Sequence, residues 1–300
     1  GGMIGKLSLA KRAASFDLVI LQKRLLPKLV FNRLRKSSKR LVFEFDDNVV
    51  LKRGEDGSVR SSPTRERRFR RAVRESDAVT TTNSVLADLA QRVSDDPEKV
   101  HVFPSVIDLS RYEPRGAPSK GPLTIGWMGS ESNLHHLEIV RQPLARLCRR
   151  FEQLTVKIVC DKAIALQGVR LEHQPYRSAN EVKDLQSFDI ALAPLVEDPW
   201  TRGKISTKVL SYFATALPVV ASNVGSNRIY IRDGENGFLV GTLTQWEEQM
   251  AHLLEEPALR ARIGAAARDS VETNFSITAM VPNYLTLFES LYASPGEAHG

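Results

Sequence analysis

The sequence predicts an α/β fold with parallel strands. Short apolar runs alternate with amphipathic stretches along the whole chain, which is typical of this class. Hydrophobic residues make up 42% and charged residues 26%, a composition that indicates a globular protein and excludes wholesale disorder. No apolar run approaches the roughly 20 residues that a membrane helix needs. A length of 300 residues is enough for two domains.

The first part of the chain alternates expected strands with expected helices. The strands are expected at 16–21, 40–45, 78–82 and 100–103. Helices are expected at 25–34 and 64–75, and a third is expected to begin at Ser84 as its N-cap and to run to Gln91. The helix at 64–75 is strongly basic and places Phe69 and Val73 on one face.

A second α/β series follows a stretch rich in proline and glycine, 112–122, which predicts a linker. Its strands are expected at 123–127, 154–160, 189–193 and 219–221. Its helices are expected at 135–150, 179–187, 207–216, 244–272 and 277–292. Pro282 is expected either to kink the last helix or to mark its start. Domains of this class bind ligands beyond the carboxyl ends of their strands, so the loops there are the candidate sites.

Charge is distributed unevenly between the two parts. Residues 1–75 hold 20 Lys and Arg against 8 Asp and Glu, a net +12, whereas the remainder holds 22 and 27, a net −5, which together give +7. The basic part suits nucleic acid, an anionic lipid or an anionic substrate, and a solvated surface is the alternative. The two cysteines are too few for a disulfide framework, and Cys160 ends an apolar run, which favours a buried free thiol in a reducing cytosol.

The most informative local pattern is a pair of lysines around a helix start. Ser206 or Thr207 is a candidate N-cap, which places Lys208 in the first helical turn and Lys204 in the preceding loop. Cations are disfavoured at a helix N-terminus, so two lysines there favour an anion bound between them and the free backbone N–H groups. Two solvated surface lysines are the alternative.

Three further features are candidates for chemistry. Gly129 and Ser130 follow a strand, and such a turn lets a phosphate approach the backbone, although glycine there is also common in tight turns. Asp46 and Asp47 end an apolar strand, where they can bind a metal, orient hydroxyls, act as a base or cap the next turn. Trp200 precedes the lysine loop and can stack on a ligand or pack at a domain interface. The histidines offer no metal-ligand spacing, and we expect no metal.

The stretch 198–240 resembles the donor-binding part of retaining GT-B glycosyltransferases of family 4, the glycosyl transferases group 1. Earlier segments resemble other parts of that family in the same order: SFDLVILQKRLLPKL, KRLVFEFDDNVV, SDAVTTTNSVLADLA, KVHVFPSVIDLSRYEP and IGWMGSESNLHHL. The tail FSITAMVPNYLTLFESLY resembles the helix that crosses back onto the first domain.

The resemblance implies a GT-B fold, two Rossmann-like domains that face a cleft. An acceptor-side domain is expected at 1–116, a donor-binding domain at 117–280 and the crossing helix at 281–300. Relatives begin with a strand and a glycine-rich loop that nothing before Phe16 resembles, so the first domain is expected to be incomplete.

The resemblance also assigns site residues. The family usually has two glutamates, the second of which holds the ribose, and their positions are occupied by Gly203 and Ser211. Tyr176 lies where relatives contact the base, and Asp46 stands where many relatives have a histidine near the reacting sugar. The implied catalytic residues are Asp46 and Asp47. The implied donor-binding residues are Gly129, Ser130, Tyr176, Trp200, Thr201, Arg202, Gly203, Lys204, Ser206, Thr207, Lys208 and Ser211.

The implied activity is transfer of a sugar from a UDP- or GDP-sugar to a glycan or lipid-linked acceptor with retention of configuration. No cofactor is expected, because basic residues and helix N-termini offset the diphosphate charge. A cytoplasmic location is implied, with the basic first part able to contact anionic lipid at the inner membrane face. The alternatives are a non-catalytic module that binds nucleotide sugars, another GT-B activity such as sugar-nucleotide epimerisation, and a nucleic-acid binder, which we do not expect.

Overall fold

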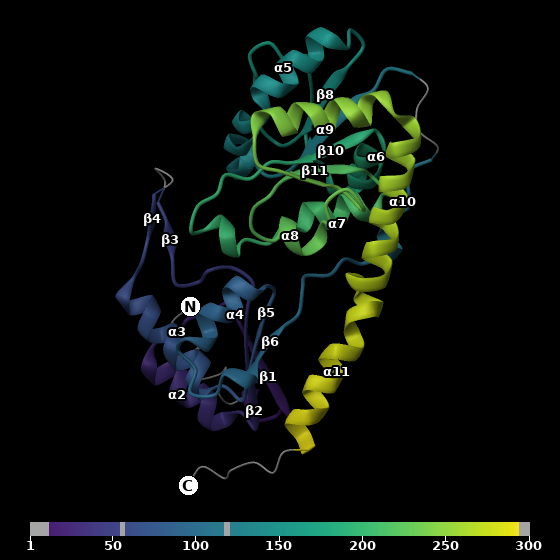
Figure 1. Cartoon of the computed structure of the whole chain (residues 1–300). Coiled ribbons are helices and arrows are strands. Elements are labelled where there is room, and N and C mark those ends of the chain that lie inside the picture. Colours follow the sequence, from purple (N-terminus) through teal and green to yellow (C-terminus); the bar gives the residue numbers. More distant parts are fainter. Residues whose placement is uncertain (1–11, 55–57, 117–120, 294–300) are drawn as a thin grey trace. The chain divides into compact units, whose positions relative to one another are not determined.

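The computed structural model describes residues 12–54, 58–116 and 121–293. The chain forms two compact units, each with its own parallel sheet (Figure 1). The first unit comprises 1–104, 202–205 and 281–300, and the second comprises 105–201 and 206–280. The α/β class and the parallel strands predicted from the sequence are therefore confirmed.

The first unit has a four-stranded sheet in the order β1-β2-β5-β6. The strands are β1 (Leu18–Gln22), β2 (Arg40–Phe45), β5 (Ala78–Thr81) and β6 (Val100–Val102), and all are parallel. The helices α2 (Lys28–Ser37), α3 (Pro63–Glu75) and α4 (Ser84–Gln91) lie between them, and β3 (Lys52–Arg53) pairs with β4 (Val59–Arg60) in a hairpin. This sheet is smaller than that of the second unit.

The alternation of side chains along β2 explains how both faces of the first sheet are covered. Phe43 and Phe45 point to one face, where they pack with Phe69 of α3. Val42 points to the other face and packs with Leu287 of α11 (Ile277–Ala293). Residues 281–293 of that helix therefore belong to the first unit.

The second unit has a six-stranded parallel sheet in the order β12-β11-β10-β7-β8-β9. The strands are β7 (Thr124–Met128), β8 (Thr155–Val159), β9 (Leu171–Gln174), β10 (Ile190–Ala193), β11 (Val219–Ser222) and β12 (Phe238–Val240). The helices are α5 (Arg141–Arg150), α6 (Glu181–Gln186), α7 (Thr207–Ala214), α8 (Asn227–Tyr230), α9 (Leu243–Glu255) and α10 (Pro257–Asn274). Short 3₁₀ helices are η1 (Pro97–Lys99), η2 (Leu109–Arg111), η3 (Glu131–Val140), η4 (Ser178–Asn180) and η5 (Thr201–Gly203).

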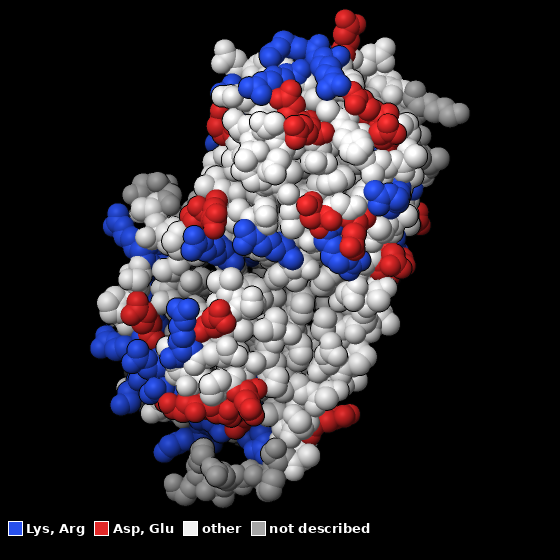
Figure 2. Space-filling model, viewed as in Figure 1, with Lys and Arg blue, Asp and Glu red and all other residues white. Residues whose placement is uncertain are grey.

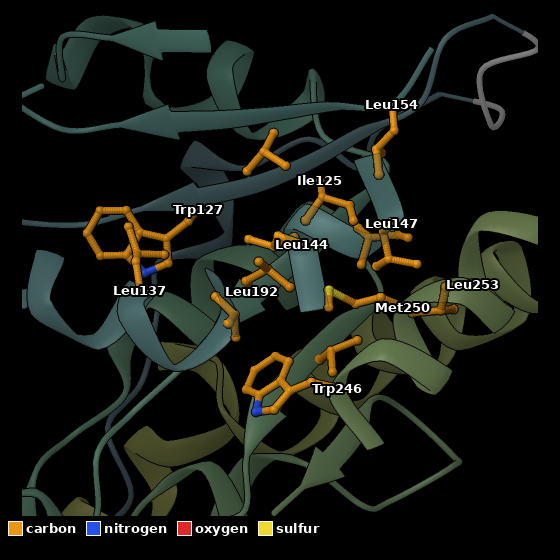
Figure 3. Close-up of a cluster of buried hydrophobic side chains, with 14 of the residues drawn as sticks. Ile125, Trp127, Leu137, Leu144, Leu147, Leu154, Leu192, Trp246, Met250 and Leu253 are labelled. Atoms are coloured by element: carbon orange, nitrogen blue, oxygen red, sulfur yellow. The ribbon is translucent and has the colours of Figure 1, made fainter. Parts of the chain in front are cut away.

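Helices cover both faces of this sheet, as expected for a doubly wound fold. On one face Ile125 and Leu192 pack with Leu144 of α5 and with Trp246 and Met250 of α9 (Figure 3). The other face carries a second cluster, in which side chains of α7 and α10 pack against strand residues such as Ala191 and Val219. Both cysteines are buried free thiols, as predicted for Cys160.

Several element boundaries differ from the sequence predictions, and proline explains two of them. The helix expected from residue 25 begins at Lys28, because Pro27 disfavours helical backbone in the residue before it. The helix expected at 244–272 is two helices, which meet at Glu256 before Pro257. Pro282 is not a helix start, since it lies inside α11.

Two other expectations were wrong for local reasons. Asn83, not Ser84, caps α4: its side chain accepts a hydrogen bond from the backbone N–H of Leu86. The first half of the helix expected at 135–150 is a 3₁₀ helix that begins at residue 131. Strands β9 and β12 were not predicted at all, β9 because it is polar and β12 because it has only three residues.

The stretch 112–122 is not simply a linker, although 117–120 lie outside the described residues. Tyr112 is buried, and Arg115 forms an ion pair of 2.8 Å with buried Asp189. The beginning of this stretch therefore packs on the second unit. No helix among the described residues is long and apolar enough to cross a membrane.

Candidate donor site of the second unit

The strand order of the second sheet places its candidate site beside β7 and β10. These neighbouring strands are separated in sequence by β8 and β9, which lie on the other side of β7. The order therefore reverses at this pair, and the crevice beyond the carboxyl ends at such a point is where open α/β sheets bind ligands. The turn after β7 begins at Gly129, and the segment after β10 leads to α7.

Gly129, Trp127 and Lys208 meet at this edge of the sheet. The ammonium group of Lys208 lies 4.4 Å from the centre of the Trp127 ring, a cation–π contact. A Cβ atom on Gly129 would lie 2.6 Å from the Trp127 ring and 3.1 Å from Lys208 Nζ, so only glycine fits here. Glycine therefore provides space at this turn. Its own N–H already donates a hydrogen bond to the carbonyl of Val159.

Helix α7 holds Lys208 in place through a contact one turn further along. The hydroxyl of Tyr212 accepts a hydrogen bond of 3.0 Å from the N–H of Met128, and it donates to the carbonyl of the same residue over 3.4 Å. Burial raises the pKa of Tyr212 far above its usual range, so the hydroxyl stays protonated. The start of α7 is thereby fixed against the end of β7.

The structure agrees in part with the predicted start of α7, a cap at Ser206 or Thr207 followed by Lys208 in the first turn. Ser206 occupies the N-cap position, but its side chain makes no capping hydrogen bond. Thr207 begins the helix and Lys208 follows in its first turn, as predicted. The backbone N–H groups of this turn, together with the lysine ammonium, make a positive edge that suits an anion.

The loop after β10 gives Trp200 and Thr201 different surroundings. Asp198 Oδ1 accepts hydrogen bonds from the N–H groups of both residues, at 2.8 and 2.7 Å. Thr201 is fully buried, and its hydroxyl donates to the carbonyl of Val196 over 2.6 Å. Its hydroxyl therefore holds the loop together, whereas Trp200 is partly exposed.

A second polar cluster joins α7 to α6. Glu181, the first residue of α6, accepts hydrogen bonds from the hydroxyls of Tyr112 over 2.6 Å and Tyr176 over 2.9 Å. Tyr112 Oη also lies 3.5 Å from Ser211 Oγ. Sequence reasoning predicted Tyr176 and Ser211 but missed Tyr112 and Glu181. Nothing in the local sequence signals this contact, because Tyr112 and Glu181 lie 69 residues apart.

Ser130, which the sequence resemblance assigns to donor binding, has hydrogen-bond partners within its own turn. It is exposed, its hydroxyl accepts a hydrogen bond of 2.8 Å from Asn133 Nδ2, and it lies 3.0 Å from Ser132 Oγ. Arg202, Gly203 and Lys204 belong to the segment 202–205, which groups with the first unit. Their assignment to the donor site stays a prediction.

The predicted acidic pair lies in the first unit, at the carboxyl end of β2. Lys23, which follows the neighbouring strand β1, forms ion pairs with Asp46 and, over 3.4 Å, with Asp47. The following turn is capped instead by Asn48, whose side chain accepts from the N–H of Val50 over 3.3 Å. Among the described residues, no group of three His, Cys, Asp or Glu side chains is arranged to hold a metal ion.

Comparison with solved structures shows the fold of the chain. A solved structure of HepE from Anabaena in complex with UDP matches 95% of this chain and 82% of its own, with a TM-score of 0.75 and 17% identity. A glycosyltransferase structure from Rickettsia africae matches 98% of this chain and 83% of its own, with a TM-score of 0.74 and 17% identity. The chain therefore has a GT-B-like fold.

Sequence comparison gives a family match for part of the chain. Residues 122–256 match the family model described as "Glycosyl transferases group 1". D-inositol 3-phosphate glycosyltransferase of Rhodococcus jostii (strain RHA1) is 23% identical over 274 residues, which cover 82% of this chain and 59% of that protein. Apart from 202–205, the matched region lies in the second unit, and it agrees with the family that the motifs of the sequence resemble. It spans between 18% and 59% of the length of the first three curated relatives it matches.

Proposed function

We propose that the protein transfers a sugar from a nucleotide-diphosphate sugar to an acceptor with retention of configuration. The observation that carries this proposal is the position of Lys208, held beside Gly129 by Trp127 and α7 at the reversal point of the sheet. A diphosphate at this edge would accept hydrogen bonds from the lysine ammonium and from the N–H groups of α7. These donors would stabilise the negative charge that develops on the leaving diphosphate. The site then needs no metal ion.

The donor is proposed to be a UDP- or GDP-sugar. The HepE structure, which shares this fold, is a complex with UDP, and this supports a uridine nucleotide as the first probe. Trp200, Arg202, Gly203, Lys204, Ser206 and Thr207 complete the proposed donor site, with Ser130 at its rim.

The acceptor is proposed to be a glycan or a lipid-linked precursor, with Asp46 and Asp47 on the acceptor side. Figure 2 shows basic side chains over α2 and α3 of the first unit, interspersed with acidic ones. This basic surface supports contact with an anionic membrane from the cytoplasmic side.

The test is release of the nucleoside diphosphate from a panel of UDP- and GDP-sugars. Purified wild-type protein is expected to release it from one donor, and Lys208→Ala is expected to lower the rate roughly 10–100-fold, because charge-assisted hydrogen bonds to the diphosphate are lost. Lys36→Ala, an exposed lysine in the last turn of α2, is the control and should leave the rate unchanged. Equal rates in all three proteins would refute the role of Lys208.

A non-catalytic binding module is the second candidate. Gly203 and Ser211 stand at the two positions where the family usually has glutamates, and Ser211 contributes no charge to the site. Binding of a nucleotide sugar without release of the diphosphate, tested with acceptor glycans present, would favour this candidate over the transferase.

A further inference from the structure

The second unit contains a cavity at the amino ends of β10 and β11, at the opposite end of the strands from the candidate donor site. Asp189 and Pro218, which directly precede these two strands, both line it. Its volume is about 320 Å³, which lies within the range of pockets that bind small molecules. The lining combines charged groups with small side chains: Arg115, Gly116, Asp189, Ala216, Pro218, Arg260, Ala261 and Ala265.

Small residues keep this cavity open, and close packing fixes its walls. A Cβ atom on Gly264 would lie 2.3 Å from the carbonyl oxygen of Ala216, so α10 lies directly on the turn before β11. Ala261 and Ala265 lie one turn apart on α10, and both are exposed. A Cβ atom on Gly116 would meet nothing within 4 Å. The space therefore exists because these positions carry no larger side chains.

The charged groups of the cavity leave an excess of positive charge. Asp189 forms its ion pair of 2.8 Å with Arg115 through one oxygen, and its other oxygen accepts a hydrogen bond of 2.8 Å from the N–H of Thr124. Burial lowers the pKa of Arg260, Asp189 opposes this effect and Arg115 adds to it, so all three groups interact. Because arginine stays charged at neutral pH, two cations share one carboxylate here.

Arg260 also has an unused hydrogen-bonding edge. The residue is only 4% exposed, and its Nη1 donates to the carbonyls of Leu253 and Leu254 at the end of α9, over 2.6 and 3.0 Å. Its Nε is buried and has no hydrogen-bond partner among the described residues. A buried donor without a partner is unfavourable. The edge of a guanidinium that carries Nε presents two parallel N–H groups, which match the two oxygens of a carboxylate.

We propose that this cavity binds a small organic carboxylate, whose oxygens accept hydrogen bonds from the free edge of Arg260 and whose apolar body packs on Ala261 and Ala265. One carboxylate charge balances the excess positive charge. The methyl groups of the walls favour a short hydrocarbon group over a hydrated inorganic anion. This site is separate from the one proposed for the nucleotide sugar, and its ligand does not depend on Lys208.

The experiment titrates butyrate and benzoate into the full chain and follows binding by saturation-transfer NMR at constant ionic strength. Butyramide and benzamide are the neutral counterparts. Wild type is expected to bind at least one carboxylate about tenfold or more tightly than its amide, because the amide lacks the charge that pairs with arginine. Inorganic phosphate, added at the same ionic strength, is expected not to displace the carboxylate.

Two variants test the position of the ligand. Ala265→Leu fills the cavity at an exposed helical position, keeps both arginines, and is expected to weaken carboxylate binding about tenfold or more because the ligand's space is lost. Ala293→Leu makes the same change at an exposed alanine at the end of α11, in the first unit, and should bind as wild type does.

Arg260→Lys tests the proposed contact itself. It keeps the positive charge and a donor for the end of α9 but lacks the planar pair of N–H groups, so it is expected to weaken binding about tenfold. Circular dichroism of each variant shows whether it is folded. If Arg260→Lys does not fold, Ala265→Leu keeps the inference testable, since that change leaves the hydrogen bonds of Arg260 in place.

Four results would overturn the inference. They are no binding of either carboxylate to wild type, equal binding to wild type and Ala265→Leu, displacement by phosphate, and loss of binding in Lys208→Ala, which would place the carboxylate in the candidate donor site instead. The first three leave the proposed function unaffected, because release of a nucleoside diphosphate is measured separately.

Discussion

Tyr212 joins helix and strand at the candidate site through one hydroxyl with two backbone partners, the N–H and the carbonyl of Met128. The side chain is fully buried, so water cannot replace either hydrogen bond. The position of Lys208, four residues earlier in α7, therefore depends on this buried hydroxyl.

Tyr212→Phe is expected to lower the free energy of unfolding by about 1–3 kcal/mol, because the N–H of Met128 is left buried without a partner. The measurement is urea denaturation followed by circular dichroism. Tyr292→Phe, at a tyrosine that is 57% exposed in α11, is the control and should change stability by less than about 0.5 kcal/mol. A Tyr212→Phe protein as stable as wild type would contradict the role given to this hydroxyl.

Among single residues, the sequence predicted those whose role is local. Lys208 could be placed in a first helical turn from the residues around it, and Gly129 from the strand before it. Glu181 and Tyr112 could not be found, since their contact depends on how three distant segments fold together. The ion pairs of Lys23 with the aspartates after β2 were missed for the same reason.

At the scale of elements, burial decided which ones were predictable. β2 and β10 are apolar because both faces of their sheets are covered, and their positions followed from the sequence almost to the residue. β9 lies at the edge of its sheet with the sequence LEHQ, which carries no such signal. The sequence predicted helix starts less accurately. Helix α2 begins after Pro27 rather than at residue 25, and α4 is capped by Asn83 rather than by Ser84.

The cap of α4 gives a direct test at this scale. Asn83→Ala is expected to destabilise the protein by about 0.5–2 kcal/mol, because its side chain accepts from the N–H of Leu86. Ser84→Ala should have little effect, since Ser84 is exposed and already inside the helix. Thermal unfolding of both variants provides the comparison. A larger loss of stability in Ser84→Ala than in Asn83→Ala would contradict this assignment and favour Ser84 as the cap.

For the whole molecule, the sequence predicted two α/β parts, and the structure contains two units with parallel sheets. The surface of the second unit shows how some of its charges are distributed. In the second unit, basic residues of α5 pair with acidic ones of α9: Arg146 with Glu247 over 2.8 Å, and Arg150 with Glu255. Figure 2 shows basic and acidic side chains together over this region, so its charge is largely compensated.

The assignment of residues 202–205 to the first unit could not have been predicted, because their neighbours in sequence belong to the second. Grouping by sequence placed Lys204 and Lys208 in one site. The structure supports that site through Lys208, Gly129 and Trp127, all of which lie in the second unit.

The central claim is that the second unit binds a nucleoside diphosphate through Lys208. The most direct measurement is titration calorimetry of UDP and GDP with wild type, Lys208→Ala and the Lys36→Ala control. The account predicts that one nucleotide binds wild type and Lys36→Ala with equal affinity and binds Lys208→Ala roughly 10–100-fold more weakly. Equal affinity for all three proteins, or no binding of either nucleotide to wild type, would contradict it.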